Sequence, residues 1–409
     1  MDYRNEEKLV LVEKREECCA CGACIGICPK QAIEFKYDSY GVAYPFIDEE
    51  KCIQCGLCKK TCHYINGNEC YFNVPRKVYA ASLKNEEVLK RSASGGIFAV
   101  LAECVLNKNG IVYGSAFQQI DGELVNRHIG ITKMDDLPFL QGSKYVQSDM
   151  GSVYHEVKQQ LLQGKEVLFS GTPCQIVGLK SFLGKEYDKL MTVDIICHGV
   201  PSKKWFQDFL HIFEKKIHGK ITQYKFRDKA NGQGYTTKIE YLDEKNRVKI
   251  KCFDGKLTSY LFYFLRSDLN RENCYSCPYA RQARVADVTL GDFWGIDKVH
   301  KEELKNSSMS DRWGISCVLL NTSKGERYFE QISEKIHFFE STYEKASIYN
   351  GQLVRPSVGT EERKILQSIY QEVGFEGINE RYNKKFWKQR MIYYFKRFVP
   401  RIIRKKFKR

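Results

Sequence analysis

The sequence predicts two folded parts in series. The first is a small α+β domain, and the second is an α/β domain with a mixed, largely parallel sheet and a helical C-terminal extension. Paired cysteine runs flank a hairpin pattern near the N-terminus, strand-like and helical segments alternate after residue 75, and residues from about 323 to 380 have a mainly helical pattern. With 409 residues, 43% of them hydrophobic, the chain is long enough for two or three domains.

Two cysteine runs near the N-terminus share the spacing C-x2-C-x2-C-x3-C. The first run is Cys18, Cys21, Cys24 and Cys28, followed by Pro29, and the second is Cys52, Cys55, Cys58 and Cys62. This spacing is typical of bacterial two-cluster ferredoxins, in which the fourth cysteine of each run binds the other cluster. We therefore assign Cys18, Cys21, Cys24 and Cys62 to one 4Fe-4S cluster, and Cys52, Cys55, Cys58 and Cys28 to a second.

Zinc is the alternative metal for closely spaced cysteine pairs. Zinc sites usually take two separated pairs, so three close thiolates plus a distant one favour iron–sulfur clusters. The second run ends at Cys62-His63, where proline is usual, and this weakens the expected turn without removing a ligand. Cys19 falls outside the spacing, and we interpret it as a bystander.

The predicted hairpin joins the two cysteine runs. Its strands are expected near Ile33–Tyr37 and Val42–Ile47, with turn residues between them. Together these features predict a ferredoxin domain over residues 10–66, followed by a polar linker that ends at Pro75.

Alternating patterns predict the α/β body. Buried strands are expected at Val78–Ala81, Ile111–Ala116, Val167–Ser170 and Met191–Ile196, and helices at Ile97–Leu106, Val153–Leu162, Ile176–Leu183 and Trp205–Ile217. Alternating segments at Ile221–Phe226, Tyr235–Leu242 and Val248–Phe253 predict an antiparallel addition. We divide the rest of the chain into residues 75–158 and 159–325 for the body, 326–380 for the helical extension and 381–409 for a basic tail.

Four cysteines of the body have local patterns of their own. Cys174 and Cys197 lie where predicted parallel strands end, which is where open α/β sheets bind ligands. Cys274 and Cys277 form a C-x2-C pair followed by Pro278. The spacing alone is weak support for a third metal site, because buried, inert cysteine is a common core residue. We apply that second interpretation to Cys70, Cys104, Cys252 and Cys317.

Small residues precede two predicted helices. Ser94-Gly95-Gly96 and Gly171-Thr172 could each expose backbone N–H groups to an anion such as a nucleotide phosphate. The alternative is an ordinary helix N-cap, by Ser94 in the first case. Gly291 to Gly295 follows a predicted strand and has the same two interpretations.

Several motifs in order resemble one family. They are Ser94-Gly95-Gly96, Gly142 to Gln147, Ser170 to Gln175, Cys197 to Pro201, Phe226-Arg227-Asp228, Cys274-x2-Cys277-Pro278 and Gly291 to Gly295. In this order, over about residues 75–325, the body resembles the family of coenzyme F-420 hydrogenase and dehydrogenase beta subunits, with a ferredoxin domain in front.

The resemblance implies an FAD and another 4Fe-4S cluster in the body. Cys174, Cys197, Cys274 and Cys277 would hold that cluster, and the Ser94–Gly96 helix start and the Lys144 loop would contact the FAD. Lys144 would then stabilise the anionic reduced flavin, and His198 would be a proton donor. A structural hydrogen bond is the alternative role for each of these two side chains.

These features predict an iron–sulfur flavoprotein oxidoreductase. Electrons would pass between the ferredoxin clusters, the body cluster, FAD and an unidentified substrate, with a redox partner protein or a small-molecule electron donor. The alternative is a non-catalytic electron-transfer subunit that serves a partner enzyme. A nucleic-acid-binding cluster protein is a third hypothesis, and the near-neutral body argues against it.

The C-terminal tail is strongly basic. Residues 381–409 contain 13 Lys or Arg and no Asp or Glu, so the remaining chain carries 15 − 13 = +2 of the net charge of +15. Aromatic and apolar residues from Phe386 to Phe398 recur at near-helical spacing before Pro400. This pattern fits docking on an anionic membrane surface, while nucleic-acid binding and a solvated end remain alternatives.

The predicted location is the cytoplasm, with the tail at the inner face of the membrane. Met1–Glu17 is charged and lacks the apolar segment of a signal peptide. Cluster thiolates also need a reducing compartment. No stretch of the sequence approaches the ~18 consecutive apolar residues of a spanning helix.

Overall fold

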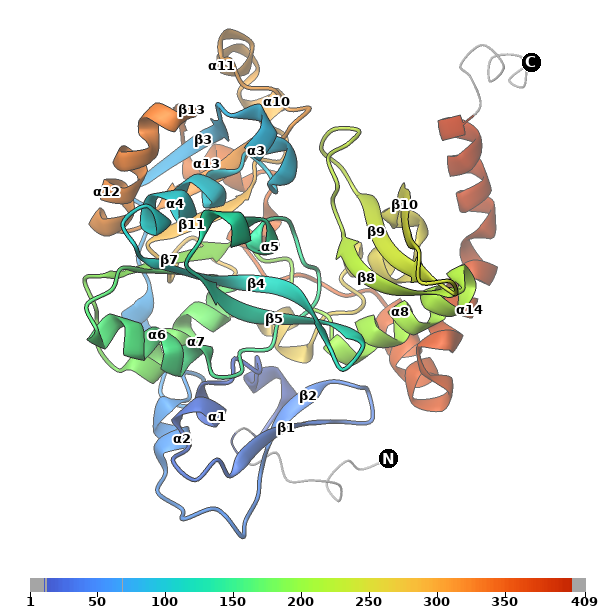
Figure 1. Cartoon of the computed structure of the whole chain (residues 1–409), viewed down its shortest axis with the longest axis horizontal. Helices are drawn as coiled ribbons and strands as arrows, with labels where there is room; N and C mark the ends of the chain where they lie inside the picture. The colour runs from blue at the N-terminus through green and yellow to red at the C-terminus, as the bar shows by residue number, and fades with distance from the viewer. Residues whose placement is uncertain (1–10, 12, 68, 399–409) are drawn as a thin grey trace.

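The computed structural model describes residues 11, 13–67 and 69–398 (Figure 1). In Figure 1 the N-terminal domain lies below α6 (Val153–Leu162) and α7 (Pro173–Leu183) of the body, and the long C-terminal helix lies on the right beside a small sheet. The predicted N-terminal hairpin is confirmed: β1 (Ile33–Tyr37) pairs antiparallel with β2 (Ala43–Ile47).

Both cysteine runs fold in the same way. Helix α1 (Ala23–Ile27) lies in the first run and α2 (Leu57–Thr61) in the second. Gly22 and Gly56 precede these helices with φ angles of +82° and +73°, a left-handed conformation that glycine adopts without steric cost. The repeat in cysteine spacing is therefore also a repeat in backbone conformation.

The body is built on an eight-stranded mixed sheet in the order β13-β3-β12-β11-β7-β6-β4-β5. The strands are β3 (Lys77–Leu83), β4 (Ile111–Ile120), β5 (Glu123–Ile131), β6 (Val167–Gly171), β7 (Leu190–Ile195), β11 (Val288–Asp292), β12 (Ser316–Leu320) and β13 (Ile336–Ser341). The four adjacent strands β4, β6, β7 and β11 are parallel, and β3 runs in the same direction, so five of these eight described strands share one direction. The predicted mixed, largely parallel sheet is confirmed.

Helices cover both faces of this sheet. The predicted helices are confirmed as α4 (Ile97–Leu106), α6 (Val153–Leu162), α7 (Pro173–Leu183) and α8 (Lys203–Ile217). Residues of α4 and of α12 (Ser323–Ile332) share one apolar cluster with the sheet, and residues of α6 and α7 share another. The predicted parts 75–158 and 159–325 both contribute strands to the same sheet, while the boundary between them stays a prediction.

The predicted antiparallel addition is a separate small sheet. Strands β8 (Gly219–Lys225), β9 (Thr236–Asp243) and β10 (Val248–Asp254) pair in the order β10-β9-β8. An aromatic-rich cluster packs β8 and β9 against α8, α9 (Ser259–Leu265) and the C-terminal helix. The remaining short helices are α3 (Glu86–Arg91), α5 (Leu137–Leu140), α10 (Ile296–Val299), α11 (Lys301–Asn306) and α13 (Tyr343–Ser347).

The C-terminal extension is mainly helical, and it also contains the strand β13. Helix α14 (Glu362–Phe398) is interrupted at Gly374, whose φ of +69° is not helical. The expectation of a mainly helical segment is wrong at β13, because Ile336–Ser341 pairs with β3 and forms the edge of the large sheet. This pairing supplies hydrogen bonds to backbone groups of β3 that would otherwise be unpaired. The contact is tertiary, so the local sequence pattern does not predict it.

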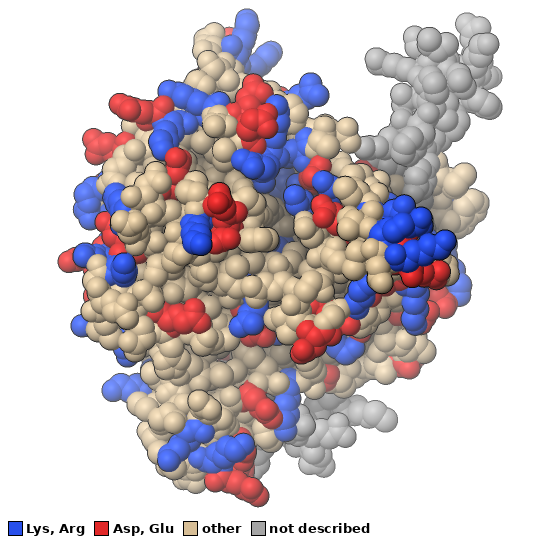
Figure 2. All heavy atoms as spheres, viewed as in Figure 1, with Lys and Arg blue, Asp and Glu red and all other residues tan. Residues whose placement is uncertain are grey.

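The predicted basic tail lies partly outside the described residues, which end at residue 398. Among the described helices, none combines the length and the apolar character needed to cross a membrane. On the face drawn in Figure 2, Lys and Arg are interspersed with Asp and Glu, as expected for a body with almost no net charge.

Candidate functional site

The structure gathers the cysteines assigned to the first ferredoxin cluster. Cys18 and Cys24 are packed in the protein, and burial raises the pKa of Cys18 to about 11. Burial also raises the pKa of Cys24, and the neighbouring Cys21, Cys18 and Cys62 add to the rise. Four neighbouring thiols that shift one another's pKa values have the soft donor chemistry of an iron–sulfur site.

The second group is more exposed. Cys28, Cys52 and Cys58 pack against a small apolar cluster that includes Ile33 and Ile47. Burial raises the pKa of Cys58, and the nearby Cys28 and Cys55 add to the rise. Cys55 itself is exposed, so this group lies near the surface, where a partner could exchange electrons.

The four body cysteines line one small cavity, which we call the thiol cavity. Its cysteines are Cys174, Cys197, Cys274 and Cys277, together with Cys19 of the N-terminal domain. Burial raises the pKa of Cys274 to about 11 and of Cys277 to about 12. Body residues separated by up to 103 positions are thus brought together, and their thiols fit a third cluster.

Cys19 is not a bystander in the structure. Its Sγ lies 3.6 Å from His63 Nε2, and its thiol also forms hydrogen bonds with the side chains of Cys21 and Cys174. The hydrogen bond from Cys19 lowers the pKa of Cys174 to about 7. Cys19 therefore links the first ferredoxin group to the thiol cavity, a role that its position outside the spacing did not reveal.

The four cysteines interpreted as buried and inert divide into three kinds. Cys317 is buried in β12, and Cys104 is half-buried and donates to Gln331 at 3.2 Å. Cys70 and Cys252 are exposed, so the prediction of burial is wrong for them. Cys252 is exposed because β10 is an edge strand.

His63 occupies the place where a proline is usual after Cys62. The side chain is buried, and its Nδ1 lies 2.7 Å from the hydroxyl of Tyr279 in the body. With Cys19 on its other nitrogen, His63 connects the ferredoxin domain to the body. The sequence showed the departure from proline but not its structural role.

Replacing His63 with alanine should weaken the docking of the ferredoxin domain by about 1–3 kcal/mol, because the buried hydrogen bond between His63 and Tyr279 is lost. Chemical denaturation followed by the cluster absorbance would measure this loss. Tyr279→Phe removes the same bond without leaving an unpaired hydroxyl and should cost less. Equal stability of His63→Ala and wild type would contradict the assigned contact.

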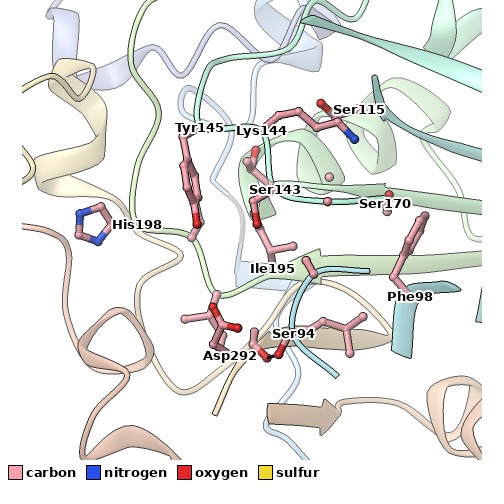
Figure 3. A pocket seen from close by; sticks show the side chains of 18 of the residues that line it. Ser94, Phe98, Ser115, Ser143, Lys144, Tyr145, Ser170, Ile195, His198 and Asp292 are labelled. Carbon is pink, nitrogen blue, oxygen red and sulfur yellow. Dashed lines mark hydrogen bonds between the residues drawn. The ribbon is translucent and has the colours of Figure 1, made fainter. Parts of the chain in front are cut away.

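A larger cavity of about 650 Å³ lies at the carboxyl ends of the parallel strands. Ser170 and Gly171 end β6, Ile195 ends β7, and Asp292 ends β11 at its wall. The predicted residues Ser94, Gly96, Lys144, Thr172 and His198 also line it (Figure 3). This volume is within the ~300–1,000 Å³ usual for ligand sites. We call it the main cavity.

Ser94 does not cap helix α4. Its hydroxyl donates to the carbonyl oxygens of Gly291 at 3.1 Å and Ile315 at 2.9 Å, so the N-cap interpretation is wrong. Gly95 is needed because a Cβ there would lie 2.2 Å from the Ala81 carbonyl oxygen. The Ser94–Gly96 segment is thereby fixed against β3, β11 and β12 at the wall of the main cavity.

Thr172 does cap its helix. Thr172 and Gln175 form a capping box at the start of α7, with the Thr172 N–H donating to Gln175 Oε1 at 3.0 Å. The N-cap interpretation of Gly171-Thr172 is therefore confirmed. The same cap holds Cys174 in the first helical turn, and the Thr172 hydroxyl lies 3.1 Å from the Cys174 sulfur.

Lys144 has an unusual environment for a lysine. Its Nζ donates to the carbonyl oxygens of Phe139 and Gln141, each at 2.9 Å. Desolvation, helped by the charge of Lys225, lowers the pKa of Lys144 to about 7. No carboxylate among the described residues is an electrostatic partner of Lys144, so an anionic ligand in the main cavity would favour its charged form.

His198 stands apart from the other labelled side chains in Figure 3. Its Nε2 lies 3.0 Å from the hydroxyl of Ser267 and 3.2 Å from the carbonyl oxygen of Phe264. Burial lowers its pKa, which favours the neutral ring. These contacts match the alternative role of His198 as a structural hydrogen-bond partner, while its role as a proton donor stays a prediction.

An ion pair that the sequence did not predict lines the main cavity. Arg227 Nη1 lies 2.5 Å from Asp292 Oδ2, and the guanidinium lies 5.6 Å from the ring centres of Tyr235 and Trp294. Both charged residues belong to motifs noted in the sequence, Phe226-Arg227-Asp228 and Gly291 to Gly295. Their pairing required the fold, because 65 residues separate them.

The two cavities share a wall. Cys19, Thr172, Cys174 and Cys197 line both the thiol cavity and the main cavity. A group held by the thiols would therefore adjoin a ligand in the main cavity.

Comparison with known proteins agrees with this arrangement. Residues 17–65 match the family model of the 4Fe-4S dicluster domain, so the chain is an iron–sulfur electron-transfer protein. Residues 164–345 match the model that describes the C terminus of the beta subunit of coenzyme F420 hydrogenase/dehydrogenase. The chain thus contains one region that matches the dicluster model and, after it, a second region that matches the beta-subunit model.

Two curated relatives match most of the chain. The F subunit of F(420)H(2) dehydrogenase from Methanosarcina mazei is 22% identical over 390 residues, which cover 90% of this chain and 97% of the relative. An uncharacterised protein of Methanocaldococcus jannaschii is 23% identical over 369 residues, covering 80% and 89%. A solved chain of the F420-reducing [NiFe] hydrogenase complex from Methanosarcina barkeri aligns with a TM-score of 0.41 at 17% identity, over 80% of this chain and 96% of that chain.

Proposed function

We propose that the protein is an iron–sulfur flavoprotein oxidoreductase. Two ferredoxin clusters and a third cluster in the thiol cavity would exchange electrons with an FAD in the main cavity. The observation that carries this proposal is the wall shared by the two cavities, which is formed partly by Cys174 and Cys197. Groups bound on its two sides would be adjacent, as electron exchange requires.

The order of the thiol groups supports a linear path. The exposed second group, with Cys55, would be the entry or exit point for a redox partner. The first group follows, and Cys19 connects it to the thiol cavity. The protein contributes burial, hydrogen bonds and charge, which set the potential of each cluster.

The main cavity has residues that suit a flavin dinucleotide. A bound flavin supplies the conversion between two-electron and one-electron transfer that a single cluster lacks. Lys144 would stabilise negative charge, while the fixed Ser94–Gly96 segment would form one wall. Arg227 and Asp292, which line the main cavity, would orient a substrate there.

Anaerobic purification followed by iron, sulfide and flavin analysis tests this function. About twelve iron atoms per chain are expected from three four-iron clusters, together with about one flavin. About eight iron atoms and no flavin would leave only the dicluster domain. Turnover by the isolated chain would favour an enzyme, whereas activity that appears only with a partner would favour the alternative of an electron-transfer subunit. The Methanosarcina mazei relative is itself named as one subunit of a dehydrogenase, so both outcomes merit the test.

We also propose that the C-terminal helix contacts an anionic membrane surface. Trp387 and Met391 are 55% and 61% exposed on α14, beside the exposed Lys384 and Lys388. Exposed apolar groups next to lysines suit the boundary of an anionic bilayer. Co-sedimentation with anionic liposomes should fall strongly when residues 381–409 are removed. Equal pelleting of both forms would refute membrane docking.

A further inference from the structure

Arg271 is the most deeply buried positive charge at the junction between the ferredoxin domain and the body. The residue is 1% exposed and immediately precedes the 3-10 helix Glu272–Ser276, which carries Cys274. Its Nη1 donates to the Ala43 carbonyl oxygen at 2.9 Å and to Gln147 Oε1 at 3.1 Å. Its Nη2 donates to the Cys18 carbonyl oxygen at 3.2 Å.

Arg271 has no carboxylate partner among the residues that the structure describes. The other fully buried arginine, Arg284, lies 3.2 Å from Asp194, and Arg227 pairs with Asp292. The Nε of Arg271 also lacks a hydrogen-bond acceptor in the described part of the chain. Burial of an uncompensated charge is costly, so such a guanidinium implies negative charge nearby.

The Arg271 charge also acts on Asp38, but that carboxylate forms an ion pair with Arg15 at 3.2 Å. The thiols of Cys18, Cys274 and Cys19 also lie within reach of the Arg271 charge. Arg271 binds a segment of each thiol group directly: its Nη2 donates to the Cys18 carbonyl oxygen at 3.2 Å, and its own carbonyl oxygen accepts from the Cys274 N–H at 3.1 Å. Cys18 belongs to the first ferredoxin group, and Cys274 belongs to the thiol cavity. The guanidinium therefore acts on two thiol groups that the proposed function assigns to different clusters.

The other neighbours of Arg271 add little negative charge. The guanidinium carbon lies 5.0 Å from the ring centre of Tyr44, whose pKa is raised by burial, so the phenol is neutral. Gln147 is uncharged and also donates to the carbonyl oxygens of Cys19 and Ala20. The sulfur ligands on the two sides are thus the main electrostatic partners of Arg271.

We propose that Arg271 is the shared counter-charge of the first ferredoxin cluster and the body cluster, and that it raises the reduction potentials of both. This inference rests on the proposed function, because it requires both clusters. A reduced cluster carries one more negative charge than the oxidised one, so a fixed cation between the two favours reduction of either. Arg271 is a positioning and tuning residue, since it binds cluster-bearing segments rather than substrate.

Redox titration of Arg271→Met and Arg271→Lys, followed by low-temperature EPR, tests the inference. In Arg271→Met, the ratio of reduced to oxidised cluster at a fixed potential should fall at least about tenfold for both clusters, a shift of about 59 mV per electron. Arg271→Lys keeps the charge and should stay close to wild type. The control is Arg281→Met, which removes a junction arginine that pairs at the surface with Glu69 at 2.8 Å, and it should leave both potentials unchanged.

The outcomes separate the inference from the proposed function. Wild-type protein with about eight iron atoms would refute the body cluster itself. Full iron content with unchanged potentials in Arg271→Met would refute only the role of Arg271. Should Arg271→Met lose iron, recovery of iron and potentials in Arg271→Lys supports the proposal. Equal loss in Arg271→Lys would overturn it, because the hydrogen bonds and not the charge would then be essential.

Discussion

Replacing Cys197 with serine should lower the iron content from about twelve to about eight atoms per chain. Cys197 follows β7 and faces Cys174, Cys274 and Cys277, so its loss removes one of the four thiolates of the proposed body cluster. Reduction of bound flavin by the ferredoxin clusters should then slow by at least about 100-fold. This exceeds the 10–100-fold loss of metal affinity or activity that is usual when only a residue hydrogen-bonded to a metal ligand is changed. Iron analysis and stopped-flow absorbance would measure both effects.

Cys317→Ala is the matched control for this substitution. Cys317 is buried in β12, and burial raises the pKa of its thiol to about 12, but it does not line the thiol cavity. The control should keep all of the iron and the rate of flavin reduction. Twelve iron atoms in Cys197→Ser would remove Cys197 from the set of ligands.

Replacing Lys144 with methionine should weaken FAD binding by roughly 10–100-fold at pH 6, because a hydrogen bond from a charged group contributes about 1.5–3 kcal/mol. The pKa of Lys144 is lowered to about 7 by desolvation, so the free protein loses this charge as the pH rises through 7. An anionic ligand favours the protonated form, and binding above pH 7 must take up a proton. The affinity of wild type should therefore fall up to about tenfold per unit from pH 7 to 9.

Titration of FAD into the flavin-free protein, followed by flavin fluorescence, measures this dependence. The affinity of Lys144→Met should be nearly flat over the same pH range. Lys225→Met offers a second check: the charge of Lys225 helps to lower the pKa of Lys144, so its removal should move the transition to higher pH. An unchanged pH dependence in Lys144→Met would exclude Lys144 as its source.

The same shift has a consequence for stability in the absence of ligand. The pKa of Lys144 lies below its unfolded value, so between about pH 7 and 10.5 the unfolded chain binds more protons than the folded one. The contribution of Lys144 to the free energy of unfolding therefore rises with pH across that window. The destabilisation caused by burying the charged Lys144 is greatest below pH 7, and a bound anion would offset it there.

Much of the fold was predictable because its signals are local. Helices α4 and α6 have the predicted bounds, and β4, β6 and β7 lie where short apolar runs occur. The paired cysteine spacing predicted the repeated turn that holds α1 and α2. Strand β13 was missed because its stability comes from pairing with β3, about 250 residues earlier in the chain.

The candidate site was predictable only in part. The spacing predicted eight ferredoxin ligands, and motif resemblance predicted Cys174, Cys197, Cys274 and Cys277 as ligands of a further cluster; these assignments stay predictions. The roles of Cys19, His63 and Arg271 were not visible, because each depends on contacts between the N-terminal domain and the body. A lone cysteine, histidine or arginine carries no spacing that marks it.

The sequence by itself determined the kind of protein, since closely spaced thiols and the periodicity of strands and helices are encoded within a few residues. Only the tertiary structure decided how the parts are connected. Burial of Arg271 between Cys18 and Cys274, and the wall shared by the two cavities, arise from packing of segments up to 253 residues apart. Such contacts follow from the global balance of packing and burial, which no local pattern records.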